Sequence, residues 1–331
     1  MLDAFLARLQ RISDDPSRIV DYLRAPRKLV RGGPLANRLG LQAARALKEQ
    51  VAWNLRSADV PEAVRPHLEV LERDGFVVIE NFLPESAMAE IDEELAHIEE
   101  LPEDRFRNVA FGKNYESKMF LVTKRTEYGA FARHLRDNAF IYDLATSLAR
   151  RRRTFKPHIN LQWVYKPDPT APYTDFEYNS YLHVDRHFPF MKAFFYLRDV
   201  GPDCAPYTFV RGSHKFNWDR LWFEYQLGVR QSAVHANGEL NTEDQKNRDR
   251  VMEQLARELR ERLALEEVPI VGKKNTLIIS NNQGLHRRWE MTGPGPRVTA
   301  NLDYKFFESP AQHLYPILKY IEAPTAKALA W

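Results

Sequence analysis

The chain has 331 residues, of which 44% are hydrophobic and 28% charged, a composition typical of a globular protein with a sizeable core. The 48 Lys and Arg residues and 45 Asp and Glu residues leave a net charge of +3, which is too small to indicate nucleic-acid binding but permits an anionic substrate. The single cysteine, Cys204, excludes an intrachain disulfide and a multi-cysteine metal site, and favours a reducing compartment, the cytoplasm.

The first 60 residues carry helical patterns that are interrupted at Pro26 and at Gly32-Gly33-Pro34, and they predict a helical N-terminal extension. The N-terminus lacks the uninterrupted apolar core of a secretory signal. The longest apolar runs of the chain are only as long as a strand. The sequence therefore predicts no transmembrane segment.

From Pro61 the pattern changes to helix, strand and helix. The first helix is expected to end at Gly75, the stretch FVVIENFL to form a short buried strand, and Pro84 to lie in the first turn of the second helix. Two further helices are predicted at Tyr128–Asp137 and Ala139–Ala149.

Strands dominate the chain after these helices. The stretch HINLQWVYKP predicts a strand with Asn160 and Gln162 on one face. Further strands are predicted near residues 180–185, 190–198 and 206–211. Two last strands, in PIVGKKNTLIIS and PRVTANLDYKFF, are expected to close a barrel.

The last of these strands alternates with a period of two. Its polar face carries Arg297, Thr299, Asn301, Asp303 and Lys305. Its other face is apolar and is expected to pack into the core.

Residues 217–265 interrupt the strands with two helical stretches, Phe216–Gln231 and Thr242–Leu265. Trp218 and Trp222 in the first stretch are predicted to be core residues. The segment falls between two parts of the candidate site described below, which favours a lid or a substrate-selecting insertion. A hairpin that only packs is the alternative.

The triplet His183-Val184-Asp185 is the most informative part of the sequence. On an extended strand, His183 and Asp185 would project to the same face while Val184 packs. One imidazole nitrogen and one carboxylate oxygen form two thirds of a facial 2-His-1-carboxylate triad. This ligand set binds non-haem Fe(II) and leaves positions open for a co-substrate and oxygen.

A third ligand has to come from elsewhere in a chain with ten histidines. His187 is near Asp185, but three near-adjacent ligands would strain one short strand. His214, in the stretch RGSHK, follows a turn and is expected to make structural hydrogen bonds. His286, in SNNQGLHRRW, follows a strand and precedes the polar-faced last strand, which makes it the strongest candidate.

Arg297 lies eleven positions after His286 and begins the last strand, with Thr299 on the same face. A guanidinium beside a hydroxyl is suited to a carboxylate, so both residues are expected to bind the distal carboxylate of 2-oxoglutarate. Gln162 is a weaker candidate for contact with 2-oxoglutarate or substrate. The alternative for all three is the exposed polar face of a strand.

These motifs, in this order, resemble the phytanoyl-CoA dioxygenase family of Fe(II)/2-oxoglutarate oxygenases. The stretches that carry the resemblance are LERDGFVVIENFLP, HVDRHFPF, PYTFVRGSHK, GLHRRW and Arg297-Val-Thr299, and they span roughly residues 65–307. The resemblance implies a mainly β fold with flanking helices, built on a double-stranded β-helix or jelly roll. It also implies iron on His183, Asp185 and His286, and 2-oxoglutarate on Arg297.

Three regions are therefore expected: a helical extension (1–60), an oxygenase jelly-roll domain (61–310) that carries the insertion 217–265, and a C-terminal tail (311–331). The predicted function is that of a dioxygenase that uses Fe(II), 2-oxoglutarate and O2 to hydroxylate a C–H bond of a small molecule, with release of succinate and CO2. The alternative is a non-catalytic metal- or ligand-binding protein that retains the fold. Neither prediction identifies the substrate.

Overall fold

The structure, a computed structural model, describes residues 30, 33–57, 59–111, 115–122, 128–150, 156–166, 180–234, 242–293 and 295–304. The predictions for residues 1–29, for the loop at 235–241 and for the tail lie outside the described residues. The division into extension, domain and tail stays a prediction.

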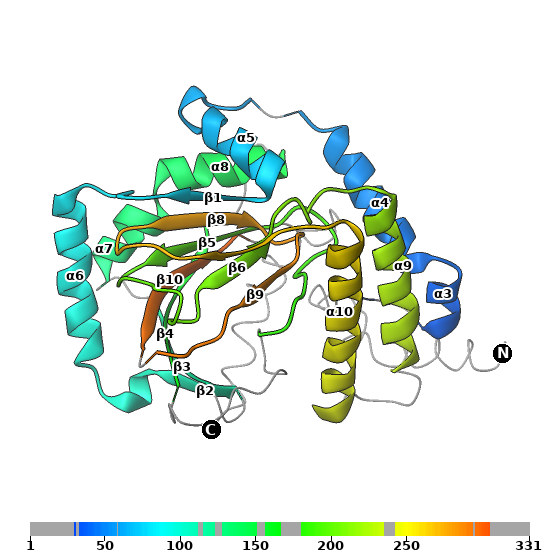
Figure 1. The fold of residues 1–331 in the computed structure, drawn as a ribbon. Helices are drawn as coiled ribbons and strands as arrows, with labels where there is room; N and C mark the ends of the chain where they lie inside the picture. Colours follow the sequence, from blue (N-terminus) through cyan, green and yellow to red (C-terminus); the bar gives the residue numbers. More distant parts are fainter. Residues whose placement is uncertain are drawn as a thin grey trace, which may run out of the picture. The chain divides into compact units, whose positions relative to one another are not determined.

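Two antiparallel sheets form the centre of the described part of the chain (Figure 1). The seven-stranded sheet contains, in spatial order, β1 (Phe76–Ile79), β8 (Leu277–Asn281), β5 (Met191–Tyr196), β10 (Arg297–Asp303), β4 (His158–Tyr165), β3 (Tyr115–Leu121) and β2 (Arg107–Phe111). The three-stranded sheet contains β7 (Glu267–Ile270), β6 (Tyr207–Val210) and β9 (His286–Arg288). This arrangement, with helices around it, confirms the predicted mainly β, jelly-roll fold.

Strand β10 is the strand that was predicted to alternate between apolar and polar residues, and its two faces differ accordingly. Val298, Ala300 and Leu302 are fully buried in the main hydrophobic core. The opposite face carries the polar side chains. Strand β10 pairs with β4 along its edge, in a register that places Thr299 opposite Gln162. A strand at the centre of the large sheet therefore presents one apolar and one polar face.

Three helices cover the apolar face of the large sheet: α5 (Arg65–Asp74), α6 (Glu85–Glu99) and α8 (Ala139–Ala149). Short helical segments accompany them at Glu62–Val64, Glu103–Arg105, α7 (Gly129–Phe131) and Ala132–Arg136. Helix α5 ends at Gly75, as predicted, and this glycine has a φ of 90°. A Cβ there would lie 2.5 Å from the His214 ring and from the Phe209 ring, so the position admits only glycine.

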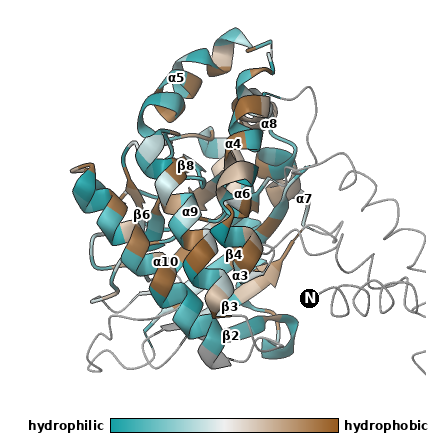
Figure 2. Cartoon of the chain, turned by 90° about the vertical axis from the view of Figure 1, so that its right-hand side faces the viewer, coloured by the Kyte–Doolittle hydropathy of each residue, from teal (hydrophilic) through white to brown (hydrophobic). Residues whose placement is uncertain are grey.

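A second group of helices contains α3 (Pro34–Arg38), α4 (Leu41–Asn54), α9 (Trp218–Ala233) and α10 (Thr242–Arg262). Helix α9 packs against the other three. Figure 2 shows α9 and α10 side by side, with hydrophobic and hydrophilic bands along α10. Met252, Leu255, Ala256 and Leu259 recur at helical spacing and are buried, which explains the pairing.

The helical insertion was predicted correctly, but its tryptophans were not. Trp218 and Trp222 are 84% and 52% exposed, because both lie outside the buried face of α9, which carries Arg220, Phe223, Glu224, Leu227 and Gln231. None of the described helices is long and apolar enough to cross a membrane.

Several strand predictions were wrong. Residues 180–185 form no regular strand, only one bridge between His183 and His286. The stretch PIVGKKNTLIIS contains two strands, β7 and β8, in different sheets, because the chain turns at Asn275, whose φ is 67°. Strands β2 and β3 were missed, since their sequences lack a clear alternation. His286 follows strand β8, as predicted, and begins strand β9, which was not predicted.

Candidate metal centre

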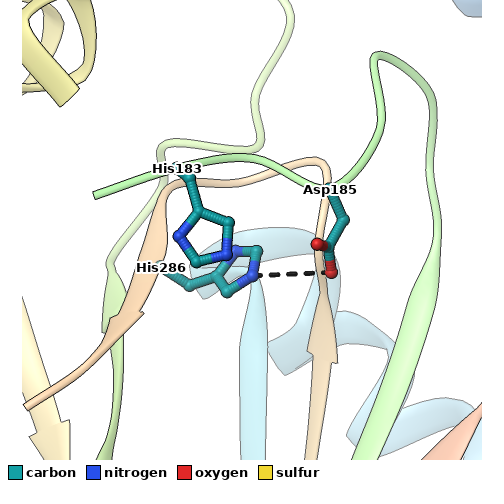
Figure 3. Close-up of side chains that lie close together, drawn as sticks. All are labelled: His183, Asp185 and His286. Carbon is teal, nitrogen blue, oxygen red and sulfur yellow. Dashed lines mark ion pairs between the residues drawn. The ribbon is translucent and has the colours of Figure 1, made fainter. Parts of the chain in front are cut away.

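Three side chains that could hold a metal ion converge between the two sheets. The potential ligand atoms of His183, Asp185 and His286 all lie within 4.8 Å of one another. Figure 3 shows the two imidazole rings and the carboxylate directed toward one another. The backbones of His183 and His286 exchange two N–H···O bonds of 3.0 Å, which bring the separate segments together. The structure thus places the predicted ligands in one cluster.

Both histidines are fixed in the tautomer that a metal requires. The Nδ1 atom of His183 lies 2.8 Å from the Tyr181 carbonyl oxygen, and that of His286 lies 3.0 Å from the Gly284 carbonyl oxygen. A carbonyl can only accept, so each Nδ1 carries the proton and donates. Each Nε2 therefore carries a lone pair, and that of His286 faces the amide nitrogen of Asn282 at 3.0 Å.

Asn282 connects two of the ligands. Its amide nitrogen lies 3.0 Å from both Asp185 Oδ2 and His286 Nε2. Its amide oxygen accepts from the hydroxyls of Ser280 at 2.6 Å and Tyr207 at 3.3 Å, which orients the amide. Sequence analysis missed Asn282 because two asparagines before a glycine are typical of a turn.

Lys192, on β5, was also missed. Its ammonium lies 2.7 Å from Asp185 Oδ2 and 4.0 Å from Asp303 Oδ1. The sequence does contain a sign of this contact, namely a lysine inside the apolar run MKAFFYL. A charged side chain in a central strand needs a partner of opposite charge.

The charges around the cluster suit a metal site. Burial lowers the pKa of His183 to about 3, so its imidazole is neutral near pH 7. Burial alone would raise the pKa of Asp185, but the Lys192 ammonium and the neighbouring histidines hold it well below its usual value. A neutral imidazole and an ionised carboxylate are the protonation states that bind a cation.

Arg297 and Thr299 begin the polar face of β10, as predicted. Arg297 is 7% exposed, and its Nη1 donates to the Ala205 carbonyl. The hydroxyl of Thr299 is buried and has no hydrogen-bond partner among the described residues. A buried guanidinium and a buried unpartnered hydroxyl two residues apart form a polar surface that a carboxylate would satisfy.

Gln162 is held by the protein at both ends of its amide. Its nitrogen donates to Ser117 Oγ at 2.7 Å, and its oxygen accepts from Asn301 Nδ2 at 2.9 Å. The side chain also lies on the wall of the cavity described next. Its predicted contact with 2-oxoglutarate or substrate stays a prediction.

A cavity of about 160 Å³ joins the metal cluster to the polar face of β10. Its lining residues are Met119, Asn160, Gln162, His183, Lys192, Phe194, Tyr207, His286, Arg287, Arg288, Arg297, Asn301 and Asp303. Thr299 is not among them. The cavity is the place where the candidate metal ligands and the candidate carboxylate anchor meet.

The two competing histidines do not belong to the metal cluster. His214 Nε2 makes a 3.0 Å hydrogen bond with the Glu72 carbonyl oxygen, as expected of a structural histidine. His187 packs edge-on against the ring of Phe188.

The sequence model of the phytanoyl-CoA dioxygenase (PhyH) family matches residues 71–260. The match contains His183 and Asp185 and ends before His286 and Arg297. A comparison with curated proteins finds no match.

Several solved structures are similar to the chain. The epimerase SnoN, in complex with Fe3+, alpha ketoglutarate and nogalamycin RO, is 18% identical, with a TM-score of 0.48 over 74% of this chain and 84% of SnoN. EctD from S. alaskensis with bound Fe is also 18% identical, with a TM-score of 0.48 over 75% and 79%. HygX from Streptomyces hygroscopicus with nickel and 2-oxoglutarate is 15% identical, with a TM-score of 0.41 over 72% and 86%.

Proposed function

This chain belongs to the phytanoyl-CoA dioxygenase family, and we propose that it is an Fe(II)- and 2-oxoglutarate-dependent dioxygenase that hydroxylates a C–H bond of a small molecule. The convergence of His183, Asp185 and His286 carries the proposal. Two imidazoles and one carboxylate are the donor set of non-haem Fe(II) oxygenases.

The protein prepares these ligands before any metal binds. Backbone carbonyls take the Nδ1 protons of His183 and His286, so neither ring has to change tautomer. Asn282 donates to Asp185 and keeps its carboxylate turned toward the rings. Bound Fe(II) would supply the oxidation, in which a substrate C–H, 2-oxoglutarate and O2 yield the alcohol, succinate and CO2.

We assign the 2-oxoglutarate carboxylate farthest from the metal to Arg297. Its guanidinium can bind a carboxylate with two parallel N–H donors. The unpartnered hydroxyl of Thr299, on the same face of β10, would donate a further hydrogen bond. Gln162 is assigned a supporting role, because its amide holds Asn301 against the same face.

Lys192 supports an anionic small-molecule substrate. An ammonium has three N–H donors, and Lys192 pairs with two carboxylates among the described residues, those of Asp185 and Asp303. The side chain lies on the cavity wall and can turn its third donor to an acidic group. Succinate formation with free carboxylic acids and with their methyl esters tests this assignment, and a preference for the esters would contradict it.

The proposed function is tested by incubating the purified protein with Fe(II), 2-oxoglutarate and O2 and following succinate with a panel of small molecules. Succinate should form in the wild type and not in His183→Ala. If no succinate forms with any substrate and iron binding is unchanged in His183→Ala, the alternative of a non-catalytic binding protein replaces the proposal.

A further inference from the structure

We propose that helices α9 and α10 hold the metal ligands in position from outside the cavity, with Arg220 and Asp249 as the positioning residues. The inference rests on the proposed function, because it assumes that the His183, Asp185 and His286 cluster binds Fe(II). It gives residues 217–265 a role that is neither a lid nor simple packing.

Arg220 connects α9 to the segment that carries His286. It is 1% exposed, and its Nη1 donates to the carbonyls of Gln283 at 2.7 Å and Ser213 at 3.2 Å. Its Nε and Nη2 donate to Glu224 Oε1 at 3.2 and 2.9 Å. A buried guanidinium with all these acceptors is rigid, so it fixes the position of the Gln283 carbonyl.

The segment from Gln283 to His286 leaves little freedom between this anchor and the metal cluster. The Gln283 side chain donates to the His187 carbonyl at 3.2 Å, which ties the segment to the one that carries Asp185. A Cβ on Gly284 would lie 2.3 Å from the Phe209 ring, so the backbone is in close contact there. The Gly284 carbonyl is the acceptor that orients the His286 ring. A shift of α9 would therefore reach His286 through three residues.

Asp249 connects α10 to the other ligand segment. The Tyr181 hydroxyl donates to its carboxylate. The Tyr181 carbonyl accepts from His183 Nδ1, and the two rings lie 5.1 Å apart. The side chain of Tyr181 is thus fixed by α10, while its backbone orients the imidazole of His183.

The two helices are themselves joined by reciprocal hydrogen bonds. Gln231 of α9 donates to the Arg248 carbonyl at 3.0 Å, and Arg248 Nη2 donates to Gln231 Oε1 at 3.3 Å. On the far side of α9, Gln42 of α4 donates to Glu224 Oε2 at 2.9 Å. One network of buried polar contacts thus reaches from α4 through α9 and α10 to both histidine segments.

The test removes each contact and measures Fe(II) binding under anaerobic conditions. Arg220→Met/Glu224→Met removes both charges of the buried pair together, because removing one would leave the other unpaired. The dissociation constant for Fe(II) should rise about tenfold, the size of effect expected for partners that orient metal ligands. The visible absorption spectrum of Co(II) bound in the same site should change, since it reports ligand geometry.

A matched control exists on α10. Glu253 and Arg257 form an i, i+4 ion pair of 2.7 Å like that of Arg220 and Glu224, but Arg257 is exposed. Glu253→Met/Arg257→Met should leave the Fe(II) dissociation constant and the Co(II) spectrum unchanged. An equal loss of affinity in this control would overturn the inference, because the effect would then be general.

A second pair of variants keeps the test decisive if the double variant on α9 does not fold. Asp249→Leu removes the acceptor for the Tyr181 hydroxyl and should weaken Fe(II) binding, whereas Asp249→Asn keeps an acceptor oxygen and should restore it. Wild-type affinity and spectrum in Asp249→Leu would overturn the role of α10. Failure of the wild type to bind Fe(II), or no loss in His183→Ala, would instead refute the proposed function.

Discussion

The two ends of the cavity differ in how completely the protein satisfies its own polar groups. At the metal end, both histidines donate to backbone carbonyls and Asp185 contacts Asn282 and Lys192. At the β10 end, two buried oxygens have no partner among the described residues: the amide oxygen of Asn301, which lines the cavity, and the hydroxyl of Thr299, which lies on the same strand but does not line it. The difference supports the proposal that the protein alone orients the candidate metal ligands, whereas a bound molecule would supply the missing hydrogen bonds at the β10 end.

The largest expected effect concerns the metal end. His286→Ala should raise the dissociation constant for Fe(II) by more than about 100-fold, because changes outside the ligand set alone cost 10–100-fold. Calorimetric titration with Fe(II) under anaerobic conditions measures it. His134→Ala, a histidine paired with Glu90 outside the cluster, is the control and should bind Fe(II) like the wild type. Equal affinity in both variants would remove His286 from the site.

The second largest effect concerns Arg297 and tests whether the two ends of the cavity bind different ligands. Arg297→Met should weaken 2-oxoglutarate binding by about 3 kcal/mol, roughly 100-fold, because it removes one partner of a buried charge pair. Fe(II) affinity should change little. Arg198→Met is the control, since Arg198 pairs with Glu99 outside the cavity. Parallel loss of Fe(II) and 2-oxoglutarate binding, or loss of neither, would contradict separate roles for the two ends.

A third effect concerns a buried histidine behind the metal end. Burial lowers the pKa of His214 from 6.5 to about 4. Below pH 6.5 the unfolded chain takes up a proton at this residue and the folded chain does not, so the free energy of unfolding falls between pH 6.5 and 4. The loss from His214 is at most about 3 kcal/mol.

Urea denaturation of the metal-free protein at pH 7 and at pH 4.5 measures this loss. His214→Asn has no titrating ring and should lose less stability than the wild type on acidification, although it is less stable at pH 7. An equal loss in both proteins would show that His214 titrates normally in the fold.

The smallest effect tests the unpartnered hydroxyl. Thr299→Val should weaken 2-oxoglutarate binding by about 1 kcal/mol, roughly fivefold, because one hydrogen bond is lost. In the ligand-free protein the same change should leave the melting temperature unchanged or raise it, since it removes a buried polar group that has no partner. A lower melting temperature with unchanged 2-oxoglutarate affinity would assign Thr299 to stability rather than to binding.

The sequence alone predicted the features that depend on local spacing. The end of α5 at Gly75 and the alternation of β10 follow from the periods of helices and strands. The pair His183 and Asp185 was identified from its residue types, although residues 180–185 form no regular strand. His286 was identified by its position before the polar-faced strand. The structure brings it to His183 by a backbone bridge between residues more than 100 positions apart.

Features that depend on long-range packing could not be predicted in the same way. Arg220 and Glu224 have the spacing of an ordinary exposed ion pair, and only the packing of α9 on α4 and on the Gln283 segment makes them buried. Strands β7 and β8 share one apolar stretch, and only the partner strands show that they belong to different sheets. Local sequence therefore identifies which residues could take part in a site. Which of them are buried together or hydrogen-bonded depends on tertiary contacts that the local sequence does not show.

The most direct test of the central claim is succinate formation from 2-oxoglutarate by the purified protein with O2 and a substrate panel, with and without Fe(II). We expect succinate to form only with Fe(II), to be absent in His183→Ala and His286→Ala, and to be strongly reduced in Arg297→Met. Succinate formation that is independent of Fe(II), or that survives the loss of either histidine, would contradict the assignment of this cluster as the metal centre.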